Sequence, residues 1–147
     1  MTHRRFSAVC FGTVLSSVVC GAADAEPSEV RGAAILDHPC GKASVKQMGL
    51  VHAGKTDEAN KLTTKELQDR WNAMPDKDRT MMSGMMKDLS KTEAQFAAEI
   101  TAAGVLTVDS PNATLTLKKT TKDASGTSTS TTTQNFKLDG GECLISR

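Results

Sequence analysis

The last third of the chain, residues 104–147, constrains the fold most, because turn signals there separate runs in which polar and apolar residues alternate. The turn signals are Asp109-Ser110-Pro111-Asn112, Asp123-Ala124-Ser125-Gly126 and Asp139-Gly140-Gly141. Between the first two, Ala113, Leu115 and Leu117 fall on one face of a strand, while the threonines and Lys118 fall on the other. The pattern predicts an antiparallel meander whose apolar face is covered by helices from upstream, and hence an α+β fold. The predicted strands are residues 113–122, 128–138 and 142–146.

Two of these strands carry an unusually polar segment. Residues 118–122 and 127–133 are lysine, threonine and serine throughout. We therefore expect a hairpin that is polar on both faces and projects beyond the core. A solvated ribbon, protected from aggregation by its lysines, is the simpler interpretation. A docking edge for a partner is the functional alternative.

Residues 1–25 have the pattern of a secretory signal peptide. Arg4 and Arg5 form a positive start, residues 6–19 are uncharged and largely apolar, and Ala23-Asp24-Ala25 is the small-x-small pattern of a cleavage site. We therefore expect cleavage after Ala25 and a periplasmic or secreted location.

The alternative export route is lipoprotein attachment at Cys20. Val19 precedes this cysteine where a small residue is expected, so the general secretory route is favoured. The apolar run before Cys20 is too short to span a bilayer comfortably as a retained helix, and no other segment approaches the required length. The sequence thus predicts no membrane span.

Export would leave a mature chain without net charge. Residues 1–25 contain Arg4, Arg5 and Asp24 from a total of 18 basic and 17 acidic residues, so their removal leaves equal numbers of each. A neutral chain has no general electrostatic attraction to nucleic acid or anionic lipid. Nucleic acid is therefore excluded as an expected partner.

The two cysteines of the mature chain, Cys40 and Cys143, lie near its opposite ends. In an oxidising compartment such a pair is typical of a disulfide. It would close a loop of about 100 residues and stabilise the fold by roughly 4 kcal/mol in the loop-entropy model. A redox or metal pair is the weaker alternative, because such chemistry usually uses closely spaced cysteines.

Upstream of the strands, helical spacing predicts a series of short helices. Residues 26–38 are expected to be a lead-in and residues 39–147 the folded domain. The predicted helices cover residues 41–53 before Gly54, a short segment from Thr56 to Leu62, a segment from Thr63 or Thr64 to Pro75, and a segment that starts at Asp76. Residues 93–103 fit both a helix and the start of a long strand, with helix slightly favoured by propensity.

The helix that starts at Asp76 is rich in methionine. Met82, Met85, Met86 and Leu89 follow the i, i+3, i+4, i+7 pattern, which predicts a buried face. A copper(I) site is chemically possible because thioethers are soft ligands, but no histidine lies in the cluster, so packing or pocket lining is favoured and no metal or cofactor is expected. The candidate pocket-lining residues are Trp71, Met82, Met85, Met86 and Phe96.

Two short motifs resemble the nuclear-transport-factor-2-like (cystatin-like, lumazine-binding-like) superfamily of small bacterial domains. The segment from Gly41 to Ala59, which includes His52-Ala53-Gly54-Lys55, is similar to that superfamily's opening helices. The segment Asp139-Gly140-Gly141-Glu142-Cys143-Leu144-Ile145 is similar to its last strand, with Cys143 where tryptophan is common. The resemblance implies a cone, in which helices pack on a curved antiparallel sheet of about four strands, and favours strand over residues 95–108.

The same resemblance leaves function open, because such folds include isomerases, dehydratases and ligand binders. A cavity enzyme usually needs a buried acid or base. The mature chain has no tyrosine, and its two histidines, His38 and His52, stand at predicted helix ends, so no catalytic residue is assigned. We expect an exported, non-catalytic domain that binds a small apolar ligand or a periplasmic protein, with a homodimer through the sheet face as an option. The alternatives are a small hydrolase or isomerase and an inhibitor or immunity protein for an envelope toxin.

Overall fold

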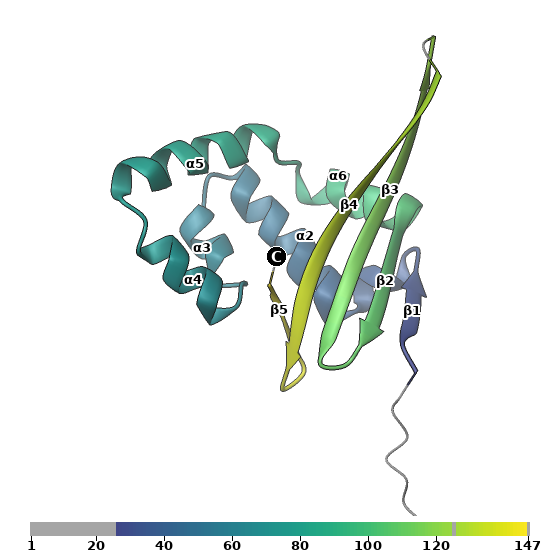
Figure 1. Ribbon diagram of the computed structural model, residues 1–147, viewed down its shortest axis with the longest axis horizontal. Helices are drawn as coiled ribbons and strands as arrows, with labels where there is room; N and C mark the ends of the chain where they lie inside the picture. Colours follow the sequence, from purple (N-terminus) through teal and green to yellow (C-terminus); the bar gives the residue numbers. More distant parts are fainter. Residues whose placement is uncertain (1–25, 125, 147) are drawn as a thin grey trace, which may run out of the picture.

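The computed structural model describes residues 26–124 and 126–146 and has an α+β architecture (Figure 1). Its elements, in chain order, are β1 (Ser28–Arg31), α1 (Ala34–Asp37), α2 (Pro39–His52), α3 (Thr56–Asn60), α4 (Lys65–Asn72), α5 (Asp76–Leu89), α6 (Glu93–Ala103), β2 (Gly104–Asp109), β3 (Asn112–Asp123), β4 (Gly126–Asp139) and β5 (Glu142–Ile145). None of the described helices is long and apolar enough to cross a bilayer.

The sheet has five antiparallel strands in chain order, β1-β2-β3-β4-β5, where the sequence predicted about four. The three predicted strands are confirmed as β3, β4 and β5, with ends shifted by one or two residues. Residues 26–38, expected to be only a lead-in, contribute a strand to the sheet: Val30 of β1 lies opposite Leu106 of β2. A four-residue polar strand has no diagnostic alternation, and β1 forms here because β2 presents an edge with which it can pair.

Helices α1, α2 and α6 cover one face of the sheet and form the core with it. The buried cluster is drawn from these three helices and from β2 to β5. Its fully buried side chains include Ile35, Ile100, Leu106, Leu115 and Phe136. Each such side chain contributes roughly 1.5–3 kcal/mol relative to exposure, so this layer holds the fold together.

Residues 93–103 form the helix α6 rather than a strand, which corrects the strand that the family resemblance implied for this part of 95–108. A capping box explains the helix start: Thr92 accepts from the backbone N–H of Gln95, and the Gln95 side chain accepts from the Thr92 N–H. Strand β2 begins at once at Gly104, where a Cβ would lie 2.5 Å from the Ile100 carbonyl oxygen. Glycine therefore permits the abrupt change from helix to strand.

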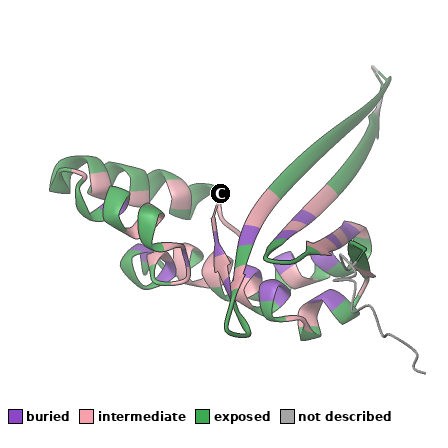
Figure 2. Ribbon diagram, turned by 60° about the horizontal axis from the view of Figure 1, so that its bottom comes forward, coloured by how far each residue is buried: buried purple, intermediate pink, exposed green. Residues whose placement is uncertain are grey.

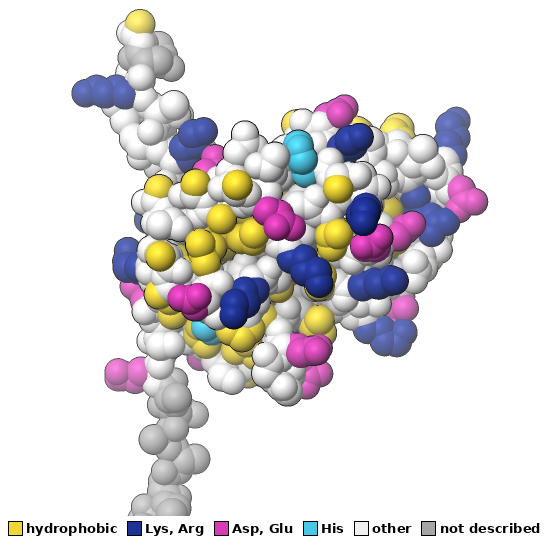
Figure 3. Space-filling view, turned by 180° about the vertical axis from the view of Figure 1, so that it is seen from behind, with side chains coloured by type: hydrophobic (Ala, Val, Ile, Leu, Met, Phe, Trp, Pro, Cys, Tyr) yellow, Lys and Arg dark blue, Asp and Glu magenta, His cyan; other side chains and the backbone are white. Residues whose placement is uncertain are grey.

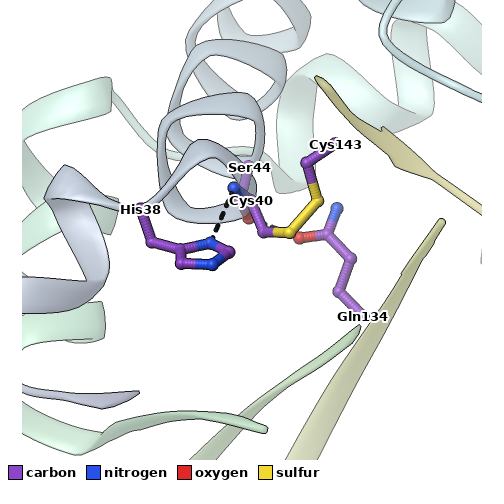
Figure 4. The surroundings of a disulfide bond; sticks show 5 residues. All are labelled: His38, Cys40, Ser44, Gln134 and Cys143. Carbon is purple, nitrogen blue, oxygen red and sulfur yellow. Dashed lines mark hydrogen bonds between the residues drawn. A yellow bond between two sulfur atoms is a disulfide. The ribbon is translucent and has the colours of Figure 1, made fainter. Parts of the chain in front are cut away.

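A disulfide joins Cys40 in the first turn of α2 to Cys143 in β5, as the sequence predicted. The two Cα atoms lie 4.9 Å apart, and the cysteines are separated by 103 residues. Figure 4 shows the bond beneath the start of α2, beside Ser44 and Gln134. The bond thus connects the first long helix to the last strand of the sheet.

The methionine-rich face of α5 is not buried, which corrects the sequence-based prediction. Met81, Met82, Met85 and Leu89 are 60%, 38%, 58% and 82% exposed, and no residue of α5 is classed as buried. Figure 2 shows α5 as a mostly exposed helix at one end of the molecule. Helical periodicity identifies an apolar face, but another element has to lie against that face to bury it.

The outer parts of β3 and β4 project from the molecule, as the sequence predicted. We call residues 118–122 and 126–133 the hairpin arm; all of them are exposed. Figures 1 and 2 show the arm rising well beyond the helices. On either side of the arm the sheet has no further strand, because β2 pairs with β3 only as far as Leu117 and β5 pairs with β4 only from Phe136.

Candidate functional site

A large apolar hollow lies between the base of the hairpin arm and helices α2 and α6. Two adjoining cavities of about 540 Å³ and about 230 Å³ share Met48, Phe96, Leu117 and Thr132 in their walls. We call them together the hairpin groove. Figure 3 views the molecule from behind, where hydrophobic side chains gather below the arm and charged side chains surround them.

One wall of the hairpin groove is built by the alternation of β3. Leu115, Leu117 and Lys119 share a face of the strand, because successive side chains point to opposite faces. Leu115 is 1% exposed, Leu117 is partly buried and Lys119 is exposed. The groove therefore changes from apolar to cationic from its inner end to its outer end.

Hydrogen bonds between side chains occupy the polar groups at the inner end. The Ser44 hydroxyl of α2 donates to Gln134 Oε1 of β4, and Gln134 Nε2 donates to Gln47 Oε1 at 3.0 Å. Ser44 is 1% exposed, so its hydroxyl would be costly to leave unpaired. With these groups paired to one another, the inner end presents mainly Phe96 and Leu115 to a ligand.

The outer end of the groove carries an excess of positive charge. Lys91 Nζ donates to Glu99 Oε1 at 2.6 Å, so these two lining residues neutralise each other. Among the side chains described, Lys118 and Lys119 take part in no ion pair. Only Lys119 shares the strand face of Leu117, which makes it the cation best placed to reach a molecule in the groove.

A second, smaller cavity of about 290 Å³ lies between α2, α3, α4 and α5, and we call it the methionine pocket. Its wall includes Trp71, Met82 and Met86. The Trp71 Nε1–H donates to Asp57 Oδ1 at 2.8 Å, which fixes the indole against the pocket. Thr56 Oγ1 is buried there without a hydrogen-bond partner in the described part of the chain.

The predicted pocket residues do not form one site. Trp71, Met82 and Met86 lie together in the methionine pocket, whereas Phe96 belongs to the hairpin groove. Met85 is 58% exposed and lines neither cavity.

Phe96 is the one predicted pocket residue among those that line the hairpin groove. The residues missed include Met48, Lys119 and Thr132. The alternation of β3 was an available signal for Lys119, because it stands two residues beyond Leu117 on the same face. Nothing in the sequence indicated that α2 and α6 would face these positions.

Neither histidine of the described chain lines a cavity. His38 caps α2: its Nδ1 accepts from the Cys40 backbone N–H at 3.2 Å (Figure 4), and burial lowers the pKa of its imidazole. His52 is exposed at the end of α2, with its Nδ1 3.3 Å from Ser90 Oγ.

Two carboxylates, from Asp57 and Asp76, line a shallow depression beside Trp71. Both are exposed; Asp57 accepts from the indole of Trp71 and Asp76 pairs with Arg79. In the chain from residue 26 on, as far as it is described, no group of three His, Cys, Asp or Glu residues could hold a metal ion.

Comparison with known proteins adds no relative: no family model, no curated protein and no solved structure matches this chain. The resemblance to the nuclear-transport-factor-2-like superfamily, and the cone that it implies, stay predictions. The geometry of the hairpin groove and of the methionine pocket is the remaining basis for assigning a function.

Proposed function

We propose that this protein is an exported, non-catalytic binding protein that holds a small apolar molecule in the hairpin groove. The proposal rests on the shape and lining of the groove. Its outer cavity has a volume of about 540 Å³, and the adjoining inner cavity is walled by Phe96, Leu115 and Leu117. Ligand sites are typically apolar clefts of about 300–1,000 Å³ with a few placed polar groups. The hairpin groove falls in this class, whereas the methionine pocket lies at its lower limit.

Export is supported by two independent features. Residues 1–25 have a secretory pattern, although they lie outside the described residues, and the Cys40–Cys143 disulfide is the kind of bond that persists in oxidising compartments. The disulfide also connects α2, which carries Met48 of the groove, to β5, which pairs with the groove strand β4.

A hydrolase or isomerase in the same groove would need a free acid or base beside the ligand. Glu99 is the acidic residue of the groove wall, and Lys91 is bound to both of its carboxylate oxygens, at 2.6 and 2.5 Å. The groove is therefore better suited to holding a molecule than to transferring its protons.

The test is to block the groove without touching the core. Thr132 is exposed on the groove face of β4, opposite Leu117, and Thr131 is exposed on the other face of the same strand. In the mature domain, Thr132→Trp should weaken binding of the neutral dye Nile red by at least about tenfold, because the indole fills the groove. Thr131→Trp is the matched control and should bind like the unmodified protein.

Both variants should keep the circular dichroism and thermal unfolding of the unmodified domain, since both positions are exposed. If Nile red does not bind the unmodified domain, or binds the Thr132→Trp variant equally well, the hairpin groove is not the ligand site.

A further inference from the structure

The hairpin groove is apolar at its inner end and positively charged at its outer end, and this difference limits which small molecules fit it. Along β3 the groove face passes from Leu115, 1% exposed, through Leu117 to the exposed Lys119. The four residue steps from Leu115 to Lys119 span about 13 Å. A molecule that fills the groove would therefore have an apolar end near Phe96 and a second end beside an ammonium group.

The charge at this second end is not neutralised within the described chain. Of the two other basic groups in the wall, Lys91 is bound to Glu99, and Lys118 belongs to the opposite face of β3. The residue opposite Lys119 on the groove face is Ser130, whose hydroxyl is uncharged. Among the described residues, Lys119 is thus a cation without a charged partner at the open end of an apolar groove.

We propose that the ligand is an anionic amphiphile, with an alkyl or aryl body between Phe96 and Leu117 and a carboxylate at Lys119. Charge complementarity selects the anion, and the roughly 13 Å of strand from Leu115 to Lys119 limits the length of the whole molecule. The proposal rests on the function proposed above, because it names the chemical class of molecule that the same groove holds.

Two probes that differ in their head group separate this proposal from simple apolar binding. Decanoate carries a carboxylate and decan-1-ol a neutral hydroxyl on the same alkyl chain. Binding to the mature domain is measured by isothermal titration calorimetry, with both probes below the concentrations at which they aggregate. Nonspecific apolar binding would favour the alcohol, since a carboxylate is costly to remove from water. We expect the opposite order, with decanoate bound about three- to fivefold more tightly.

The lysine is tested with a matched pair of variants. Lys119→Gln should remove the preference for decanoate and leave the affinity for decan-1-ol unchanged. Lys122→Gln removes the same charge from the arm at a position outside the groove wall, and should behave like the unmodified domain. Raising the salt concentration to about 1 M should reduce the preference in the unmodified domain, because exposed charges are screened.

The outcomes separate the two proposals. If neither probe binds although Nile red does, this inference fails and the proposed function stands. If Nile red does not bind either, both fail. If both probes bind and Lys119→Gln changes neither affinity, the groove binds apolar molecules and the anionic class is wrong. An equal loss in the Lys119→Gln and Lys122→Gln variants would mean that the general charge of the arm acts, which also overturns the inference.

Discussion

The inner and outer halves of the β3–β4 hairpin share one continuous ladder of paired residues but differ in how far their side chains are buried. In the inner half, Ala113, Leu115 and Phe136 are 2%, 1% and 1% exposed beneath the helices. In the outer half, which is the hairpin arm, every residue is exposed. Backbone pairing is therefore common to both halves, and burial of side chains distinguishes them.

The difference explains where a binding site can form on this hairpin. The side chains of the inner half are packed in the buried core of the domain and leave little room for a ligand. The arm by itself offers no enclosed surface. The hairpin groove lies where the two meet, with Leu117 at the last position opposite β2 and Lys119 already on the arm. Stability and binding should consequently respond to different parts of the same two strands.

The largest expected effect breaks the inner half. Phe136→Ala removes a side chain that is 1% exposed and should lower the free energy of unfolding by about 3–5 kcal/mol, because it loses buried area and leaves a cavity. Urea denaturation of a chain of residues 26–147 measures this change.

Thr129→Ala in the arm of the same strand is the control and should change the free energy of unfolding by less than about 0.5 kcal/mol. If both variants lowered the free energy of unfolding by similar amounts, the division of the hairpin into a buried half and an exposed half would be wrong.

A smaller effect is expected from the disulfide that connects α2 to the strand beside the inner half. Cys143→Ser should lower the free energy of unfolding by about 2–4 kcal/mol, because the opened loop is long. Denaturation curves of the oxidised and the dithiothreitol-treated unmodified domain provide the comparison.

A Cys40→Ala/Cys143→Ala double variant controls for the thiol left buried by the single change. Stability equal to that of the oxidised domain in all these samples would show that the bond contributes nothing to the fold.

The smallest effect concerns the start of α2, where the imidazole of His38 accepts from the Cys40 N–H. Burial lowers the pKa of His38 below its ordinary value of 6.5, so the unfolded chain binds the proton more readily. The stabilisation is therefore complete above pH 6.5 and is lost as the pH falls through the lowered pKa of the folded state.

From about pH 7 to pH 5, loss of this cap should lower the free energy of unfolding by up to about 1 kcal/mol relative to a His38→Asn variant. Asparagine also caps helices and does not titrate, so the difference between the two proteins isolates the imidazole. Parallel pH profiles would exclude this role. The arm contains no histidine, and substitutions there should leave the difference unchanged.

Local chemistry allowed much of this fold to be predicted. The strands β3 to β5 follow from alternation between turn residues, which places Leu115 and Phe136 on the same face of the sheet. The pairing of Cys40 with Cys143 follows from there being only two cysteines in the expected mature chain. Helix α6 could also have been assigned, because Thr92 and Gln95 form a capping box that is visible in the sequence.

The features that the sequence left open depend on which distant segments meet. Strand β1 exists because the edge of β2 is available to it. The apolar face of α5 stays largely exposed, because its Met82 and Met86 border an open pocket instead of a packed core. The hairpin groove likewise requires Met48, Phe96 and Leu117 to converge from α2, α6 and β3. Periodicity records which way a side chain points along its own element, whereas burial and binding depend on what the folded chain places opposite it.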